Sequence, residues 1–312
     1  MKIKLLLIFF LSFVLGACTD GRQERLSTNI QSSEYLLQVL SSDLENNHIR
    51  NALLLREYAN ILAQKRPELK SLLTQLSQDS TTRGTLYSGL VQRLKTLKEQ
   101  PTAIGDIEAQ LFESESLMAA SDPNLFNDAL SDPVNVIADM SEGTLARVNA
   151  VSQSLSLQAN QAEDNGAGSQ LVGNPGYGQW QTNSSGMSFW QWYGMYAMFS
   201  ALAPNPIRYD RWSSRRDYSY YNDVGRNRYT SPNNVKKQDN LAKKTQKQFS
   251  GQGRFKSPYA KSRMGASSMS SSSQTAQRTR SFSGKSSYSK AKASSSFRNS
   301  LSTTSRGIRR GK

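Results

Sequence analysis

The uneven distribution of charge along this 312-residue chain limits its fold more than any other feature. Residues 19–200 carry 20 acidic and 12 basic residues, whereas residues 201–312 carry 4 and 25. The final stretch, 232–312, combines 19 Lys and Arg with one acid and abundant Ser. Such a composition buries too little apolar surface to offset the entropy that folding removes. The sequence therefore predicts an acidic folded body followed by a disordered basic tail over 232–312.

Residues 26–160 are expected to form a small, mainly α domain of about five to seven helices. Leu and one Ile recur at steps of three, four or seven residues in 26–44, and Leu recurs every three or four residues in 83–98, which is the spacing of one helical face. Residues 49–64 continue the pattern with an apolar stripe that includes Leu53 and Ile61. No part of this stretch shows the alternation of a strand. A tetratricopeptide-type array is the alternative, although its Trp-Leu-Gly-Tyr signature is absent.

Two Asp-Pro pairs stand ten residues apart late in this domain. Asp122-Pro123 and Asp132-Pro133 each fit an N-cap followed by the first helical position. Both pairs therefore predict helix starts, and a last helix is expected to run to residue 160. Residues 161–186 then turn to Gly, Asn, Gln and Ser, which is typical of a linker.

An uncharged, aromatic stretch begins the segment 187–231. Residues 187–203 contain thirteen apolar or aromatic residues, and we expect them to form one helix. Seventeen helical residues span about 25 Å, which is short for a bilayer core of about 30 Å. The helix either completes the core of the body or contacts a membrane surface or partner; a transmembrane span fits less well. The candidate interface residues are Trp190, Trp192, Tyr193, Tyr196 and Phe199.

Arginines alternate with aromatic residues in the second half of this segment. Arg pairs with phosphate in a fork and stacks on rings, which Lys does not. This pattern predicts a polyanion-binding surface made of Arg208, Arg211, Arg215, Arg216, Arg226 and Arg228. The alternative is a Tyr-rich coil in which these arginines pair locally with Asp210, Asp217 and Asp223.

The N-terminus has the pattern of a secretory signal peptide over residues 1–17. Two lysines precede an apolar run too short to span a membrane. Leu15-Gly16-Ala17-Cys18 resembles the lipobox of bacterial lipoproteins. The resemblance implies that Cys18 carries lipid, including palmitate, and that residues 18–25 form a short tether. Because Thr19 rather than Asp follows Cys18, it also implies the outer membrane more than the inner.

The residue inventory gives little support to catalysis. With one Cys and one His, the chain has no disulfide framework, Cys/His zinc site or Cys-His catalytic pair. The single His48 stands before a helix, where a surface or capping role is expected. The acidic pairs Asp106/Glu108 and Glu113/Glu115 are two residues apart, so on a helix their members point to different faces. We expect no catalytic residues, no metal and no cofactor.

Together these patterns predict a non-enzymatic envelope lipoprotein. Cys18 would anchor it in the membrane, the helical domain would bind a protein partner, and the basic aromatic region would contact anionic polymers or lipid head groups. Two alternatives are a helical accessory subunit of an envelope complex and an extracellular nucleic-acid-binding lipoprotein. Beyond the lipobox, the composition of about the last 130 residues loosely resembles that of uncharacterised envelope lipoproteins.

Overall fold

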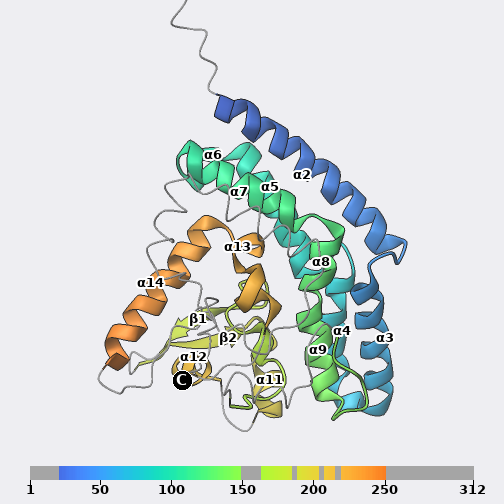
Figure 1. Ribbon diagram of the computed structural model, residues 1–312. Helices are drawn as coiled ribbons and strands as arrows, with labels where there is room; N and C mark the ends of the chain where they lie inside the picture. Colours follow the sequence, from blue (N-terminus) through green and yellow to red (C-terminus); the bar gives the residue numbers. More distant parts are fainter. Residues whose placement is uncertain (1–20, 149–162, 185–187, 204–206, 215–218, 251–312) are drawn as a thin grey trace, which may run out of the picture.

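The computed structural model describes residues 21–148, 163–184, 188–203, 207–214 and 219–250 (Figure 1). These residues are mainly α-helical, which confirms the predicted fold class. We call 21–148 the helical body and the described residues of 163–250 the C-terminal segment. The signal peptide, Cys18, the predicted helix towards residue 160 and residues 251–312 lie outside the described residues.

The helical body is a succession of helices joined by short turns. In chain order they are α2 (Gly21–Glu45), α3 (Arg50–Lys65), η1 (Pro67–Leu69), α4 (Lys70–Ser77), η2 (Gln78–Ser80), α5 (Thr85–Glu99), α6 (Pro101–Ile104), α7 (Ile107–Ala120), α8 (Pro123–Ala129) and α9 (Ser131–Met140). Helix α2 lies along one side of the body and packs on α7, while α3 packs on both α4 and α9 (Figure 1). Residues 21–25, expected to be tether, belong to α2.

Leucine spacing determines which faces of α2 and α5 are buried. In α5, Leu86, Leu90, Leu94 and Leu97 are all buried, as their spacing predicts. The stripe expected over 49–64 is confirmed at Ile49 and Leu62, which are buried, and wrong at Leu53 and Ile61, which are exposed. The buried face of α3 consists of smaller residues together with leucines: Asn51, Ala52, Leu55, Ala59 and Leu62.

The C-terminal segment packs against the helical body and shares its hydrophobic core. Its elements are η3 (Ser169–Leu171), β1 (Gly178–Thr182), β2 (Ser188–Trp192), α11 (Tyr196–Leu202), α12 (Tyr209–Ser214), the π-helical turn η4 (Tyr221–Gly225), α13 (Arg226–Tyr229) and α14 (Pro232–Phe249). The stretch predicted to be a linker is mostly buried over residues 165–178. Leu171, Val172 and Tyr177 are each at most 2% exposed, so this Gly-rich stretch is part of the core.

The single helix predicted for 187–203 is wrong. Residues 188–192 form β2, which pairs antiparallel with β1 so that Trp180 faces Trp190. Trp190 and Trp192 are buried while Gln191 between them is exposed, and this period of two belongs to a strand. Gly194 then adopts a left-handed φ of 61°, and a short helix, α11, follows.

The tail prediction is wrong for residues 232–249, which form α14. Ser231 caps the helix by accepting a hydrogen bond from the Asn234 backbone N–H, and Pro232 occupies the first helical position. The face that packs inward consists of Val235, Gln238, Ala242 and Thr245. The buried face of α14 is therefore half polar. Its few apolar residues give little sequence signal that the segment forms a packed helix.

Two glycine substitutions should separate close packing from helix propensity. A Cβ at Gly178 would lie 2.2 Å from the Gln191 carbonyl oxygen, so Gly178→Ala should force β1 and β2 apart. We expect a loss of about 1–3 kcal/mol in the free energy of unfolding, measured with urea. Gly89 in α5 has no atom within 4 Å of an added Cβ, so Gly89→Ala should gain about 0.5–1 kcal/mol. Equal effects at both positions would contradict this packing.

Candidate functional site

Buried carboxylates of the helical body line the surface on which the C-terminal segment lies. Asp79, Glu113 and Asp132 are each at most 2% exposed. A fourth, Asp139, has a side chain 7% exposed. A carboxylate removed from water is unfavourable unless donors reach it. In this protein the C-terminal segment supplies many of those donors.

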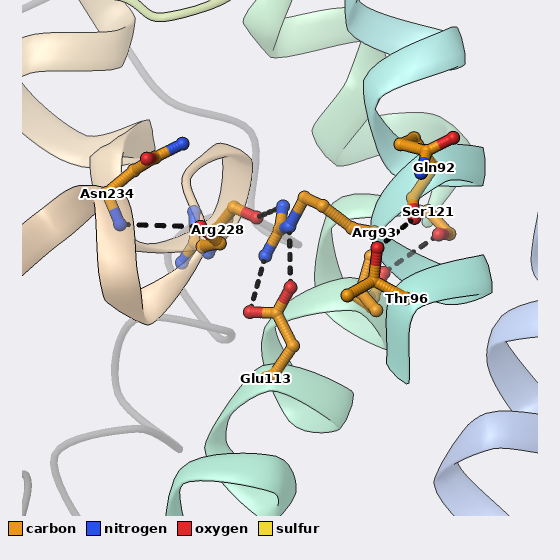
Figure 2. A network of polar contacts seen from close by, with 9 residues as sticks. Gln92, Arg93, Thr96, Glu113, Ser121, Arg228 and Asn234 are labelled. Carbon is orange, nitrogen blue, oxygen red and sulfur yellow. Dashed lines mark hydrogen bonds and ion pairs between the residues drawn. The ribbon is translucent and has the colours of Figure 1, made fainter. Parts of the chain in front are cut away.

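An arginine–glutamate pair joins α5 and α7 to α13 (Figure 2). Arg93 donates from Nε and Nη2 to the two carboxylate oxygens of Glu113, at 2.8 and 3.0 Å. Its remaining nitrogen, Nη1, donates to the backbone carbonyl of Arg228. The planar guanidinium therefore donates hydrogen bonds both to a buried carboxylate of the body and to a backbone carbonyl of the C-terminal segment. Tyr229 reaches the same helix pair by donating to the Ala120 carbonyl at 3.1 Å.

Asp132 does not cap α9, because the N-cap position of that helix is Leu130. Its carboxylate instead accepts hydrogen bonds from the backbone N–H groups of Tyr220 and Tyr221, at 2.7 and 2.9 Å. The Ser219 hydroxyl donates a third bond at 3.1 Å. The first Asp-Pro pair behaves as the sequence predicts, since Asp122 caps α8.

Two further acids receive donors from residues 163–184. Asp79 accepts from the Tyr177 hydroxyl and, within the body, from the Thr85 hydroxyl. Asp139 accepts from the Gln170 side-chain amide at 2.7 Å and lies 3.8 Å from the Arg147 guanidinium. The Gly-rich stretch is therefore fixed by side-chain hydrogen bonds to α9 and η2.

Burial changes the proton affinity of these acids. Burial raises the pKa of Asp79, and the hydrogen bond from Tyr177 opposes that rise. For Asp132, burial outweighs the bonds from Tyr221, Tyr220 and Ser219 and raises the pKa to about 7. Burial also raises the pKa of Asp139, against the attraction of Arg147. The pKa of Tyr177 is raised well above its usual value by burial and by Asp79, so this phenol remains a donor.

Helix α14 presents a lysine face on the side opposite its buried residues. This lysine face consists of Lys236, Lys237, Lys243, Lys244 and Lys247, all exposed. Exposed Asn233, Asn240 and Gln248 lie among these lysines. At about 1.5 Å per residue, the five lysines cover roughly 16 Å of helix length. Lysines spaced by seven and four residues are a sequence signal for one face of a helix. Here these lysines lie inside the segment that the sequence predicts to be a disordered tail.

The structure separates the predicted aromatic interface residues. Trp190, Trp192 and Phe199 are at most 3% exposed, and Trp192 stacks on Phe199 with ring centroids 4.4 Å apart. Packing into the core therefore replaces the predicted interface at these three residues. Tyr196 is half-buried, and only Tyr193, at 49%, is a well-exposed member of this predicted set.

The predicted arginine surface is also divided. Arg226 and Arg228 are buried, at 7% and 2% exposed, so they are not available to a polyanion in this structure. Arg226 donates to Gln238 on α14 at 2.6 Å and to Asp239 at 2.9 Å. Arg208 and Arg211 are exposed, and Arg211 lies 3.5 Å from Glu163. Arg215 and Arg216 lie outside the described residues.

Nothing in the described part of the chain forms a metal site or a membrane span. No group of three or more His, Cys, Asp or Glu there could hold a metal ion, and none of its helices is long and apolar enough to cross a bilayer. His48 is exposed and lies 3.1 Å from Asp43. Comparison with protein-family models, curated proteins and solved structures finds no match for the chain.

Breaking the Arg93–Glu113 pair should destabilise the protein far more than breaking a surface pair does. Their side chains are 12% and 2% exposed, so Arg93→Ala leaves a buried carboxylate without its partner. We expect a loss of about 3–5 kcal/mol in the free energy of unfolding. The exposed Lys98–Glu34 pair provides the control, and Lys98→Ala should cost less than about 1 kcal/mol. Similar losses from both variants, measured by urea unfolding, would show that Glu113 does not depend on Arg93.

Proposed function

We propose that this chain is a non-enzymatic lipoprotein of the bacterial envelope whose lysine face contacts an anionic envelope component. Cys18 in its lipobox-like sequence would anchor the chain, and the outer membrane is the favoured location. The helical body would hold the C-terminal segment, and thereby α14, in a fixed orientation.

The lysine face is the observation that carries this proposal. Five exposed lysines gather on one side of α14, while its opposite side is packed into the protein. In Figure 1, α14 lies at the edge of the molecule away from α3, so its outer side is not covered by the body. Clustered cations of this kind attract polyanions and release their counterions, which makes the binding strongly salt-dependent.

The chemistry of the face also indicates how it would bind. Between residues 233 and 248 the exposed side chains of α14 are Lys, Asn and Gln. A helix that inserts into a membrane interface needs an exposed apolar face, whereas Val235 and Ala242 of α14 are buried in the protein. Contact with phosphate groups at the surface of a polymer or membrane therefore fits α14 better than insertion does.

A charge-matched pair of variants tests the lysine face. The full-length protein in mild detergent is titrated against fluorescent polyphosphate at several NaCl concentrations. Lys243, Lys244 and Lys247 changed together to Gln should lower the slope of log affinity against log salt by roughly 2, at about 0.7 per lost contact. The control changes three exposed lysines of the body, Lys65, Lys70 and Lys95, to Gln. Equal losses from both triple variants would refute a specific surface on α14.

Polyphosphate and single-stranded DNA of equal charge distinguish the phosphate surface from the nucleic-acid alternative. We expect similar affinities for the two polymers, because the face offers no exposed aromatic ring between residues 233 and 248 on which a base could stack. An affinity for DNA far above that for polyphosphate would favour the nucleic-acid-binding lipoprotein.

Replacing Cys18 tests the anchor. Cells that express the full chain are grown with radiolabelled palmitate, and the protein is recovered from membrane and soluble fractions. The parent protein should carry label and sediment with membranes, whereas Cys18→Ser should lose the label and most of the membrane association. Thr19→Ser is the control and should keep both. Unlabelled parent protein would contradict lipidation at Cys18.

A further inference from the structure

The start of α2 limits how far the folded protein can lie from Cys18. Helix α2 begins at Gly21, only three residues after Cys18. Because an extended chain spans at most about 3.6 Å per residue, Cys18 lies within about 11 Å of Gly21. The tether that the sequence predicts over 18–25 is therefore cut short by helix. A lipid on Cys18 would hold the folded protein directly against the membrane.

The first turns of α2 are joined to the rest of the helical body. Leu26 is buried, and the side-chain amide of Asn29 donates to the Ser114 hydroxyl of α7 at 3.0 Å. Arg25 lies 2.6 Å from Glu115 of the same helix. These contacts fix the position of the anchored end relative to α7, so the body cannot swing freely about the start of α2.

Helix α14 lies close to this anchored end. Helix α7 contacts both α2 and α14. At the start of α14, the side-chain amide of Asn233 donates to the Ala103 carbonyl of α6 at 3.0 Å. Figure 1 shows α6 and the start of α2 at the same end of the molecule. Since packed helices lie about 8–10 Å apart, only about two such distances separate the start of α2 from that of α14.

The outer side of α2 and the lysine face of α14 carry opposite charge. Between residues 26 and 45, α2 has three acids and no Lys or Arg, so an anionic membrane would repel it. Helix α14 has five exposed lysines, and its single acid, Asp239, is paired with Arg226. Screening limits these forces to about 10 Å, a range that the short connection to Cys18 allows. An anionic membrane would therefore turn α14, and not α2, towards its surface.

We propose that the lysine face lies on the lipid head groups of the leaflet that holds the Cys18 lipid. This inference rests on the proposed function and identifies its anionic component as lipid phosphate. The lipid raises the effective concentration of the lysines at the membrane, and the lysines in turn strengthen the hold of the lipid. Each lysine next to an anionic leaflet should strengthen the association about fivefold.

Lysine acetylation in vesicles tests this orientation. The full-length lipidated protein is diluted from mild detergent into preformed vesicles, with or without phosphatidylglycerol in phosphatidylcholine. Each lysine's rate of modification by acetic anhydride is then measured by mass spectrometry. We expect Lys243, Lys244 and Lys247 to react at least about fivefold more slowly in the anionic vesicles. Lys65 and Lys70, which are exposed on the body, should react equally in both.

A matched pair of variants shows whether α14 itself causes this protection. Lys243→Gln, Lys244→Gln and Lys247→Gln together should weaken the contact about 100-fold and return Lys237 towards its rate in neutral vesicles. Lys65→Gln, Lys70→Gln and Lys95→Gln together should leave Lys237 protected. This readout separates α14 from residues 251–312, which carry fourteen Lys and Arg and no acid and could also attract the vesicle.

Equal rates for the α14 lysines in the two kinds of vesicle would overturn the inference, and so would equal protection of Lys65 and Lys70. The polyphosphate titration separates this failure from that of the proposed function. If α14 still determined polyphosphate binding, the lysine face would stand as a surface for a soluble polymer. If it did not, the proposed function would fail as well.

Discussion

The structure depends on satisfying carboxylates that the fold removes from water. Asp79, Asp132 and Asp139 lie in the helical body, yet each accepts at least one hydrogen bond from residues beyond 163. A buried acid without such donors costs several kcal/mol, more than most single apolar contacts supply. The C-terminal segment therefore supplies hydrogen bonds to buried carboxylates of the body, and the two parts share one hydrophobic core.

This arrangement explains why the acidic helical body and the basic C-terminal segment do not simply neutralise each other's charge through ion pairs. The donors that reach Asp79, Asp132 and Asp139 across the boundary are phenol, hydroxyl, amide and backbone groups rather than lysines. Short hydrogen bonds in a buried setting are directional, whereas surface ion pairs contribute little. The lysines of α14 remain exposed on the outer side of the helix.

The sequence predicts the parts of the fold that depend on local pattern. Leucines spaced by three or four residues identify α2 and α5, and Asp122-Pro123 marks the start of α8. The sequence does not predict the structure where contacts with residues far away in the chain determine it. Asp132-Pro133 has the same pattern as its neighbour, but a segment 87 residues away takes its carboxylate. Helix α14 was missed because its buried face is half polar, so it lacks the apolar period that identifies a helix without knowledge of its partners.

The π-helical turn η4 connects the residues that bind Asp132 to Arg226, which binds α14, so the length of the chain in this turn matters. A π turn accommodates one residue more than an α turn, so residues before and after 221–225 have a fixed rotational offset. Deleting one residue there would leave an ordinary α turn of nearly the same rotation, so the elements that follow would keep their direction. An inserted residue that the turn does not absorb would instead rotate everything that follows by about 100°. Arg226 would then point away from Gln238, and the lysines would face a new direction. Point substitutions on the exposed side of α14 should be tolerated during evolution, whereas insertions between Tyr220 and Arg226 should not.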